Sequence, residues 1–106
     1  MKTITQRSDF LSFSRKDTVY LSQYLVIQVR ENRRAYVRLG ITVSKRYGRA
    51  VERNQFRRRV KEAFRQSDLK DLGGIDFHVR AIHRLPISYE EIKASLQHVS
   101  QSFTQK

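Results

Sequence analysis

The sequence contains no cysteine, which excludes disulfide bonds and zinc sites built on thiolates. Long apolar runs are also missing. The longest, YLVI at residues 24–27, is far shorter than the roughly 20 residues that a membrane-spanning helix needs. No apolar stretch follows the charges of the N-terminal MKTITQRSDF, so we expect no signal peptide. Together these absences favour a reducing, cytoplasmic location.

Acidic residues are scarce as well. Asp and Glu total 10 against 22 Lys and Arg, which gives a formal net charge of +12 in 106 residues. The hydrophobic content of 39%, with five Tyr and six Phe, still suffices for one modest core, so we expect a single domain over residues 1–106. The charge predicts a polyanionic partner, most often nucleic acid; an anionic membrane surface and simple solubility are the alternatives.

The positive charge is concentrated in one segment. Residues 1–44 hold eight basic and three acidic residues, residues 45–65 nine and two, and residues 66–106 five and five. More than half of the excess therefore lies in residues 45–65, and seven of the nine cations there are arginine. The planar guanidinium group suits bidentate phosphate contacts and stacking on bases, which favours a nucleic-acid docking surface over a merely solvated one.

The N-terminal third is predicted to contain a short helix and then strand. Residues 8–16, SDFLSFSRK, are expected to be helical, with Ser8 as the cap and Phe10 and Phe13 on one face. Residues 18–32 are rich in Val, Ile and Tyr and predict a strand that ends in the turn ENRR. A further short strand can lie within the same segment.

Two later segments alternate apolar and polar residues as half-buried strands do. In AYVRLGITVS the predicted buried side is Ala35, Val37, Leu39, Ile41 and Val43. The opposite side is polar and partly basic, with Tyr36, Arg38, Thr42 and Ser44. In IDFHVRAI the apolar side is Ile75, Phe77, Val79 and Ala81.

Two further helices complete the expected fold. After the turn KRYGRA, one helix is predicted to reach about residue 66, with a core stripe of Phe56, Val60, Ala63 and Phe64. The last helix is predicted from the capping box Ser88–Glu91 and the hydrophobic staple Ile87–Ile92, and its inward side is Ile92, Leu96, Val99 and Phe103. The order α-β-β-β-α-β-α predicts an α+β fold, a two-layer sandwich in which helices cover one face of a mixed sheet of three to four strands.

The basic helix presents its cations in rows. Arg53, Arg57, Lys61 and Arg65 follow one another at i+4 steps and form a ridge roughly 18 Å long, with Asn54 and Arg58 beside it. Both rows lie away from the apolar stripe, so the helix can pack on a sheet and still present cations to solvent. The basic turn SKRYGR leads into the helix N-terminus, where unpaired backbone N–H groups favour phosphate.

The segment GITVSKRYGRAVERNQFRRRVKEAFR resembles the signature of the bacterial ribonuclease P protein family. The residues that match are Gly40, Val43, Ser44, Lys45, Gly48, Ala50, Val51, Arg53, Asn54, Arg58, Glu62, Phe64 and Arg65. At positions 46, 57 and 61 this chain exchanges Lys and Arg relative to the common pattern and keeps the charge. The resemblance extends over nearly the whole chain, because SDF, RLG and SYEEIKASLQH follow the family order.

The resemblance implies a protein subunit that works with a catalytic RNA to remove the 5′ leader of precursor tRNA. It implies that the catalytic RNA binds the signature loop and helix, at Lys45, Arg46, Arg49, Arg53, Asn54, Arg57, Arg58, Lys61 and Arg65. It also implies a cleft for the single-stranded leader, to which we assign Phe10, Phe13, Tyr36, Arg38 and Arg80. The Mg²⁺ of the reaction would be held mainly by RNA, with no cofactor intrinsic to the protein.

No catalytic centre is predicted in the protein itself. Asp68, Asp71 and Asp76 flank a GG turn without a metal-binding pattern and are expected at helix ends and turns. The three histidines are scattered, and no base–nucleophile pair is present. Two alternatives remain open at this point: a generic RNA-binding or ribosomal-type protein without a catalytic partner, and a metal-dependent nuclease in its own right.

Overall fold

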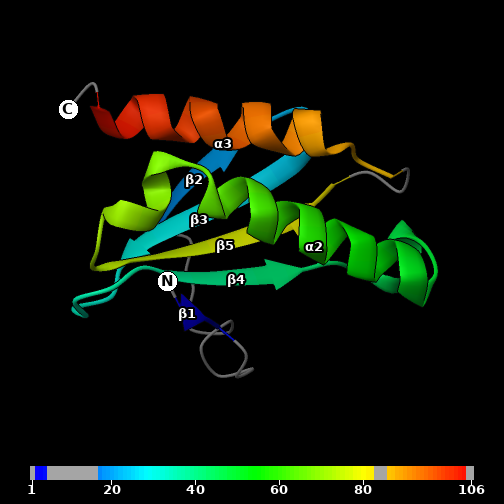
Figure 1. Cartoon of the computed structure of the whole chain (residues 1–106), viewed down its shortest axis with the longest axis horizontal. Helices are drawn as coiled ribbons and strands as arrows, with labels where there is room; N and C mark the ends of the chain where they lie inside the picture. The colour runs from blue at the N-terminus through cyan, green and yellow to red at the C-terminus, as the bar shows by residue number, and fades with distance from the viewer. Residues whose placement is uncertain (1, 5–16, 83–85, 105–106) are drawn as a thin grey trace.

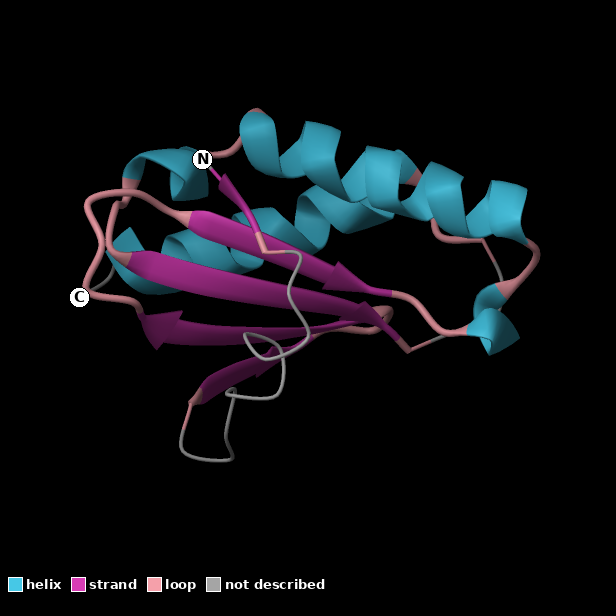
Figure 2. Cartoon of the chain, turned by 90° about the horizontal axis from the view of Figure 1, so that it is seen from below, coloured by secondary structure: helices cyan, strands magenta, loops and turns pink. Residues whose placement is uncertain are grey.

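The computed structural model describes residues 2–4, 17–82 and 86–104, which form one mixed β-sheet with two α-helices on one of its faces (Figures 1 and 2). The elements are β1 (Lys2–Thr3), β2 (Thr18–Leu21), β3 (Leu25–Glu31), β4 (Arg38–Thr42), the 3₁₀ turn η1 (Lys45–Tyr47), α2 (Ala50–Arg65), the 3₁₀ turn η2 (Asp68–Asp71), β5 (Ile75–Ala81) and α3 (Tyr89–Thr104). The helix predicted for residues 8–16, with Phe10 and Phe13, lies outside the described residues. No helix in the described part of the chain is both long and apolar enough to cross a membrane.

The sheet has the strand order β1-β4-β5-β3-β2. Strand β4 pairs in parallel with β1 and β5, whereas β3 pairs antiparallel with β5 and β2. Parallel neighbours need a long crossover, and α2 provides it between β4 and β5, so this helix must lie over the sheet. The predicted α+β sandwich with helices on one face is confirmed.

Within the described residues the sheet has five strands, instead of the three to four predicted. Strand β1 has two residues, too few to show any periodicity, and it pairs with β4. The segment 18–32 does divide into two strands, β2 and β3. Ser22 joins them, because its backbone N–H donates to the Leu25 carbonyl and its hydroxyl accepts from the Leu25 N–H, each at 3.0 Å.

The core lies between the sheet and the two helices, and the α2 stripe enters it as predicted. Phe56, Val60, Ala63 and Phe64 are all buried. The Phe64 ring meets Phe77 of β5 edge-on, with 5.2 Å between ring centroids, and Phe56 meets Tyr47 of η1 at the same distance. The aromatic side of α2 therefore holds the helix on the sheet and fixes which of its sides faces solvent.

Helix α3 begins as the capping signals predict. The Ser88 hydroxyl accepts a hydrogen bond from the Glu91 N–H at 3.2 Å, and Ile87 and Ile92 on either side of the cap are buried. Further along the helix Leu96 and Val99 are buried too. The Ile87 N–H also donates to the Tyr47 hydroxyl at 2.8 Å, which ties the start of α3 to the loop that precedes α2.

The strand predicted over residues 35–44 is shorter, because β4 begins only at Arg38. Ala35 is exposed, contrary to its predicted burial, since it lies in the turn after β3. Gly73 and Gly74 pack against this turn with positive φ angles of 68° and 63°. A Cβ at either would lie 3.2 Å from a backbone carbonyl oxygen of the turn. The GG break therefore fixes the end of the sheet where β4 and β5 begin.

Candidate nucleic-acid interface

The loop before α2 presents cations and uses an acid to start the helix. Lys45 and Arg46 are exposed on η1. Glu52 turns back to the helix start, where its carboxylate accepts from the Arg49 backbone N–H and from Arg49 Nε, both at 3.1 Å. These hydrogen bonds, led by the one from the backbone, hold the pKa of Glu52 below its ordinary value. One of the two acids in residues 45–65 therefore serves as a cap.

The exposed side of α2 carries the predicted cationic ridge. Arg53 donates to the Gly48 carbonyl at 2.8 Å, and Arg57 donates to the Asn54 side chain at 3.2 Å. Neither bond neutralises a charge. Arg58 and Lys61 are exposed and form no ion pair with any described residue. The solvent side of α2 is thus strongly electropositive.

Acids neutralise little of this charge. Within the described residues, only Arg49 and Arg65 of the nine predicted RNA-binding positions pair with a carboxylate, with Glu52 and Glu62 respectively. Both arginine side chains are largely exposed, at 84% and 68%. Exposed pairs of this kind contribute little to stability and exchange readily with a stronger anion. The ridge is therefore available for phosphate.

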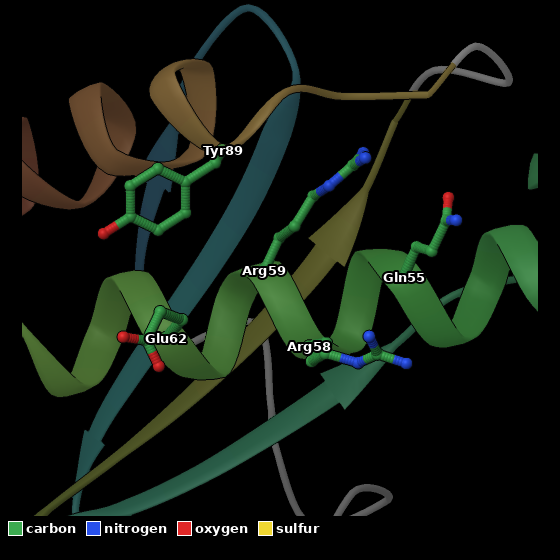
Figure 3. A pocket seen from close by; sticks show the side chains of 5 residues that line it. All are labelled: Gln55, Arg58, Arg59, Glu62 and Tyr89. Atoms are coloured by element: carbon green, nitrogen blue, oxygen red, sulfur yellow. The ribbon is translucent and has the colours of Figure 1, made fainter.

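Two surface grooves flank α2. One, of about 290 Å³, lies toward the β1–β4 edge and is lined by Thr3, Ile4, Ile41, Arg57 and Lys61. The other, which we call the α2–α3 groove, has a volume of about 480 Å³ and is lined by Gln55, Arg58, Arg59, Glu62 and Tyr89 (Figure 3). Arg59 is a cation of α2 that the sequence analysis did not include among the binding residues.

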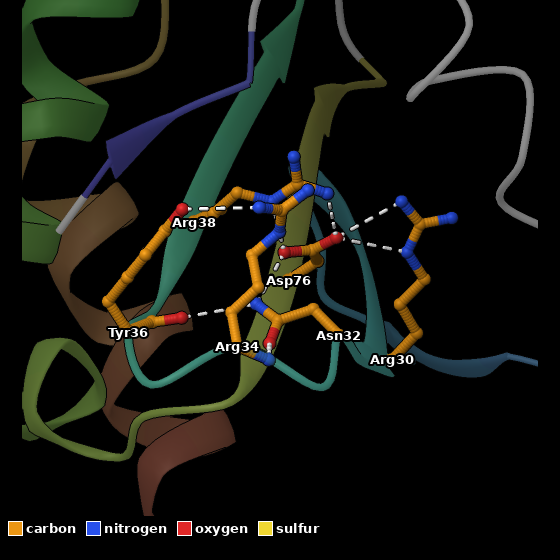
Figure 4. Close-up of polar contacts among 6 residues, drawn as sticks. All are labelled: Arg30, Asn32, Arg34, Tyr36, Arg38 and Asp76. Carbon is orange, nitrogen blue, oxygen red and sulfur yellow. Dashed lines mark hydrogen bonds and ion pairs between the residues drawn. The ribbon is translucent and has the colours of Figure 1, made fainter.

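The helix-free face of the sheet carries a buried ionic cluster (Figure 4). Asp76 of β5 has no exposed surface and accepts from Arg38 Nε at 2.8 Å and Nη2 at 2.6 Å, from Arg30 at 3.1 and 3.0 Å, and from Asn32 at 2.8 Å. Burial alone would raise the pKa of this carboxyl group, but the hydrogen bonds from Arg38, Asn32 and Arg30 lower it below its ordinary value. Asp76 therefore stays ionised, and its predicted position in a turn is wrong.

His78 lies beside this cluster on the same face. Its Nε2 is 2.7 Å from the Thr42 hydroxyl and its Nδ1 is 3.2 Å from the Gln28 amide oxygen. Burial, reinforced by the charges of Arg80 and Arg30, lowers the pKa of His78 to about 4. At neutral pH the imidazole is thus an uncharged hydrogen-bonding group in the middle of the face and adds nothing to the positive charge.

Comparison with known proteins identifies the family. The family model described as Ribonuclease P matches residues 1–104. The chain belongs to the ribonuclease P protein family. It is 32% identical over 100 residues to the ribonuclease P protein component of Clostridioides difficile (strain 630), a match that covers 92% of this chain and 88% of the relative.

Solved structures of the family share the fold. The RNase P protein of Staphylococcus aureus superposes on this chain with a TM-score of 0.81 at 28% sequence identity. The match covers 95% of this chain and 94% of the Staphylococcus aureus chain. The RNase P protein of Thermotoga maritima superposes with a TM-score of 0.79 at 27% sequence identity, and the match covers 93% of this chain and 94% of the Thermotoga maritima chain. The chain is accordingly a protein component of the ribonuclease P holoenzyme, which processes tRNA 5′ ends, and the generic RNA-binding alternative is not favoured.

The structure brings the nine predicted RNA-binding positions onto one continuous stretch, η1 followed by α2. It does not bring the predicted leader residues together in the same way. Tyr36 and Arg80 are exposed, but Arg80 pairs across the sheet with Thr42, at the end of β4 opposite to Tyr36. Arg38 is only 12% exposed and is held by Asp76, and its assignment to the leader cleft stays a prediction. Phe10 and Phe13 lie outside the described residues.

Arg34 is a further cation that the sequence analysis did not assign to the leader cleft. Its guanidinium donates to the Tyr36 hydroxyl at 3.2 Å and lies 5.9 Å from the centre of the Tyr36 ring. Both side chains are exposed at the turn before β4. The ENRR segment carried the signal for a basic turn, but only the fold shows that this turn adjoins the aromatic ring.

Proposed function

We propose that this chain binds the catalytic RNA of ribonuclease P through η1 and the α2 ridge, and that it binds the single-stranded leader of precursor tRNA along the helix-free face of the sheet. The observation that carries the first half is the α2 surface. Its apolar stripe is fully buried, whereas its cations face solvent with few acids to neutralise them.

Phosphate neutralisation gives this surface its binding energy. Each cation that meets a phosphate releases condensed counterions, so binding is strong at low salt and weakens steeply as salt rises. The ridge from Arg53 to Arg65 extends for roughly 18 Å along a rigid helix, a length suited to the backbone of a folded RNA. Arginine dominates the ridge and adds bidentate contacts that fix the register of the two molecules.

The proposed leader surface is different in character. Tyr36 offers an exposed ring with Arg34 beside it at one end, and Arg80 offers a cation at the other. Arg80 lies opposite Thr42, six residues beyond Tyr36, so the two ends are roughly 20 Å apart along the strand direction and can contact separate nucleotides of one extended strand. Stacking on an aromatic ring contributes about 1–3 kcal/mol per base and demands no particular sequence. That tolerance suits leaders of varied sequence.

We assign the chemistry to the RNA partner. Among the described residues no group of three or more His, Asp or Glu side chains could hold a metal ion. The buried carboxylate of Asp76 is bonded to two arginines and an asparagine, which leaves it unsuited to hold a metal ion. We therefore propose that Mg²⁺ is held mainly by RNA phosphates and that the protein alone is inactive.

A cleavage assay on precursor tRNA tests the proposed function. The protein without RNA should leave the 5′ leader in place, and addition of a bacterial ribonuclease P RNA should restore 5′ processing at low Mg²⁺. The mature product should carry a 5′-phosphate. Efficient cleavage by RNA-free protein would contradict the proposal and favour the nuclease alternative, and failure with every bacterial catalytic RNA would favour a generic RNA-binding protein.

The leader contact can be tested separately at Tyr36. Tyr36→Ala should weaken binding of precursor tRNA to the holoenzyme by about 5- to 150-fold, because a stacked base loses its platform. Tyr36→Phe keeps the ring and should bind as the wild type does. Binding of mature tRNA, which has no leader, should be the same for all three proteins. Equal losses with leader-bearing and leader-free RNA would place the role of Tyr36 elsewhere.

A further inference from the structure

The α2–α3 groove lies beside the ridge but is built differently. A ridge contacts the backbone of a folded RNA from outside, whereas this groove is a concave site of about 480 Å³ with one aromatic ring and two arginines in its lining. That volume is within the range of small-ligand sites. We propose that the groove takes one unpaired nucleotide of the catalytic RNA, with its base against Tyr89 and its phosphate against Arg58 and Arg59. This inference rests on the proposed function.

Tyr89 is held as a rigid platform. It is the first residue of α3, directly after the Ser88 cap, and its ring packs partly against the core. Its hydroxyl donates to the Gln66 side chain at 2.9 Å, just beyond the C-terminal end of α2. The ring is thus fixed by both helices, and Figure 3 shows it extending from α3 toward α2. A ring ordered before binding loses little conformational entropy when a base stacks on it.

The two arginines supply the anion contacts. Arg59 donates through Nη1 to the Ile87 carbonyl at 3.0 Å, which orients its guanidinium between α2 and the segment that precedes α3 (Figure 3). A guanidinium has five N–H donors, so this bond leaves others for a phosphate. Arg58 is exposed and has no hydrogen-bonding partner among the described residues.

The acid in the lining does not neutralise these arginines. Glu62 binds Arg65 through Oε2 and accepts from Gln66 at 2.8 Å through Oε1, so both of its oxygens are engaged at the C-terminal end of α2. These contacts, led by the hydrogen bond from Arg65, hold the pKa of Glu62 below its ordinary value. The lining thus keeps two cations available for an anion.

The remaining lining residue points to a nucleotide as the occupant. Gln55 is exposed, and its amide offers both a donor and an acceptor, as the edge of a base requires. A partner protein would be expected to bury an apolar patch, whereas this groove combines charge, amide and a single ring. A base in a duplex is stacked on both sides and cannot stack on Tyr89, so the nucleotide must be unpaired.

Matched substitutions at Tyr89 test the inference. Tyr89→Leu removes the ring but keeps apolar packing, and it should weaken binding of the catalytic RNA by about 5- to 150-fold at fixed salt. Tyr89→Phe keeps the ring and loses only the bond to Gln66, so its affinity should stay within about twofold of the wild type. The salt dependence should not change for either, because the ring carries no charge. Thermal unfolding of each variant reports whether the fold is intact.

Two further measurements keep the test decisive if Tyr89→Leu folds poorly. Arg59→Gln should flatten the slope of log K against log[salt] by about 0.7, the loss of one phosphate contact with an unpaired strand. A photo-crosslinking residue at position 55 should attach to an unpaired nucleotide of the RNA. The inference would be overturned, and the proposed function left intact, if the crosslinks were confined to duplex RNA or to protein. The same conclusion would follow if Tyr89→Leu bound RNA with full affinity while Arg57→Gln bound more weakly. Absence of RNA binding by the wild type would instead refute the proposed function.

Discussion

Replacing Asp76 with alanine should lower the free energy of unfolding by about 3–5 kcal/mol. The Arg30 and Arg38 side chains are only 16% and 12% exposed, and both form an ion pair with this carboxylate. Alanine would leave two largely buried positive charges without it, in a protein whose net charge is already +12. The loss would be a large fraction of the total stability, since natural domains unfold with only about 5–15 kcal/mol.

Urea unfolding followed by circular dichroism measures this effect. Asp71→Ala provides the matched control, because Asp71 is exposed and its ion pair with Lys70 is a surface contact at 3.5 Å. Surface substitutions of this kind change stability by about 0.5 kcal/mol or less. If Asp76→Ala cost no more than Asp71→Ala, the cluster would not hold strands β3, β4 and β5 together as its contacts indicate.

Removing three α2 cations, two from the ridge and Arg58 beside it, should have the second large effect; we call this triple substitution the ridge variant. The variant Arg57→Gln, Arg58→Gln and Lys61→Gln should bind the catalytic RNA about 100- to 1,000-fold more weakly than the wild type at 0.1 M salt. Each phosphate contact raises log K by about 0.9 when the salt concentration falls from 1 M to 0.1 M, and the variant loses three such contacts. Glutamine keeps a good helix propensity, and none of the three side chains belongs to the core stripe, so the fold should persist. A filter-binding or fluorescence titration with the catalytic RNA gives the two dissociation constants.

A second variant distinguishes the effect of where the cations lie from the effect of the total net charge. Arg33→Asn, Lys70→Gln and Lys93→Gln also lower the net charge by three, from +12 to +9, and all three residues are exposed outside α2. Asparagine is chosen at position 33 because the backbone there has a φ of 59°, which Asn tolerates better than most residues do. This variant should lose far less affinity than the ridge variant. Similar losses in both would mean that bulk charge, and not the α2 surface, directs binding.

Local sequence signals were sufficient for most of the fold. The Phe56–Phe64 stripe predicted both the helix and its buried side, because a 3.6-residue period leaves one solution for a helix that must cover a sheet. Ser88 and its neighbours predicted the start of α3, since a cap acts within a single turn. The cationic ridge followed from the same helical geometry once the buried side was known.

Contacts between residues far apart in the sequence could not be predicted from local signals. Asp76 and Arg38 are 38 residues apart and meet only because β4 and β5 pair in parallel in a particular register. The alternation of apolar and polar residues placed Arg38 on the polar face of its strand, but it could not show that a buried carboxylate forms an ion pair with Arg38. Arg59 was overlooked for a similar reason, because its groove is completed by α3 and the Ile87 carbonyl, 28 residues further along the chain. Strand β1 was missed because two residues show no pattern.

The salt dependence of catalytic-RNA binding tests the central claim most directly. If η1 and α2 neutralise about six phosphates, log K should fall against log[salt] with a slope of about −5 for the wild type. The ridge variant should flatten this slope by about 2–3, whereas the variant with three exposed cations removed elsewhere should retain it. A slope that stays the same after Arg57, Arg58 and Lys61 are replaced would show that the RNA docks on another surface.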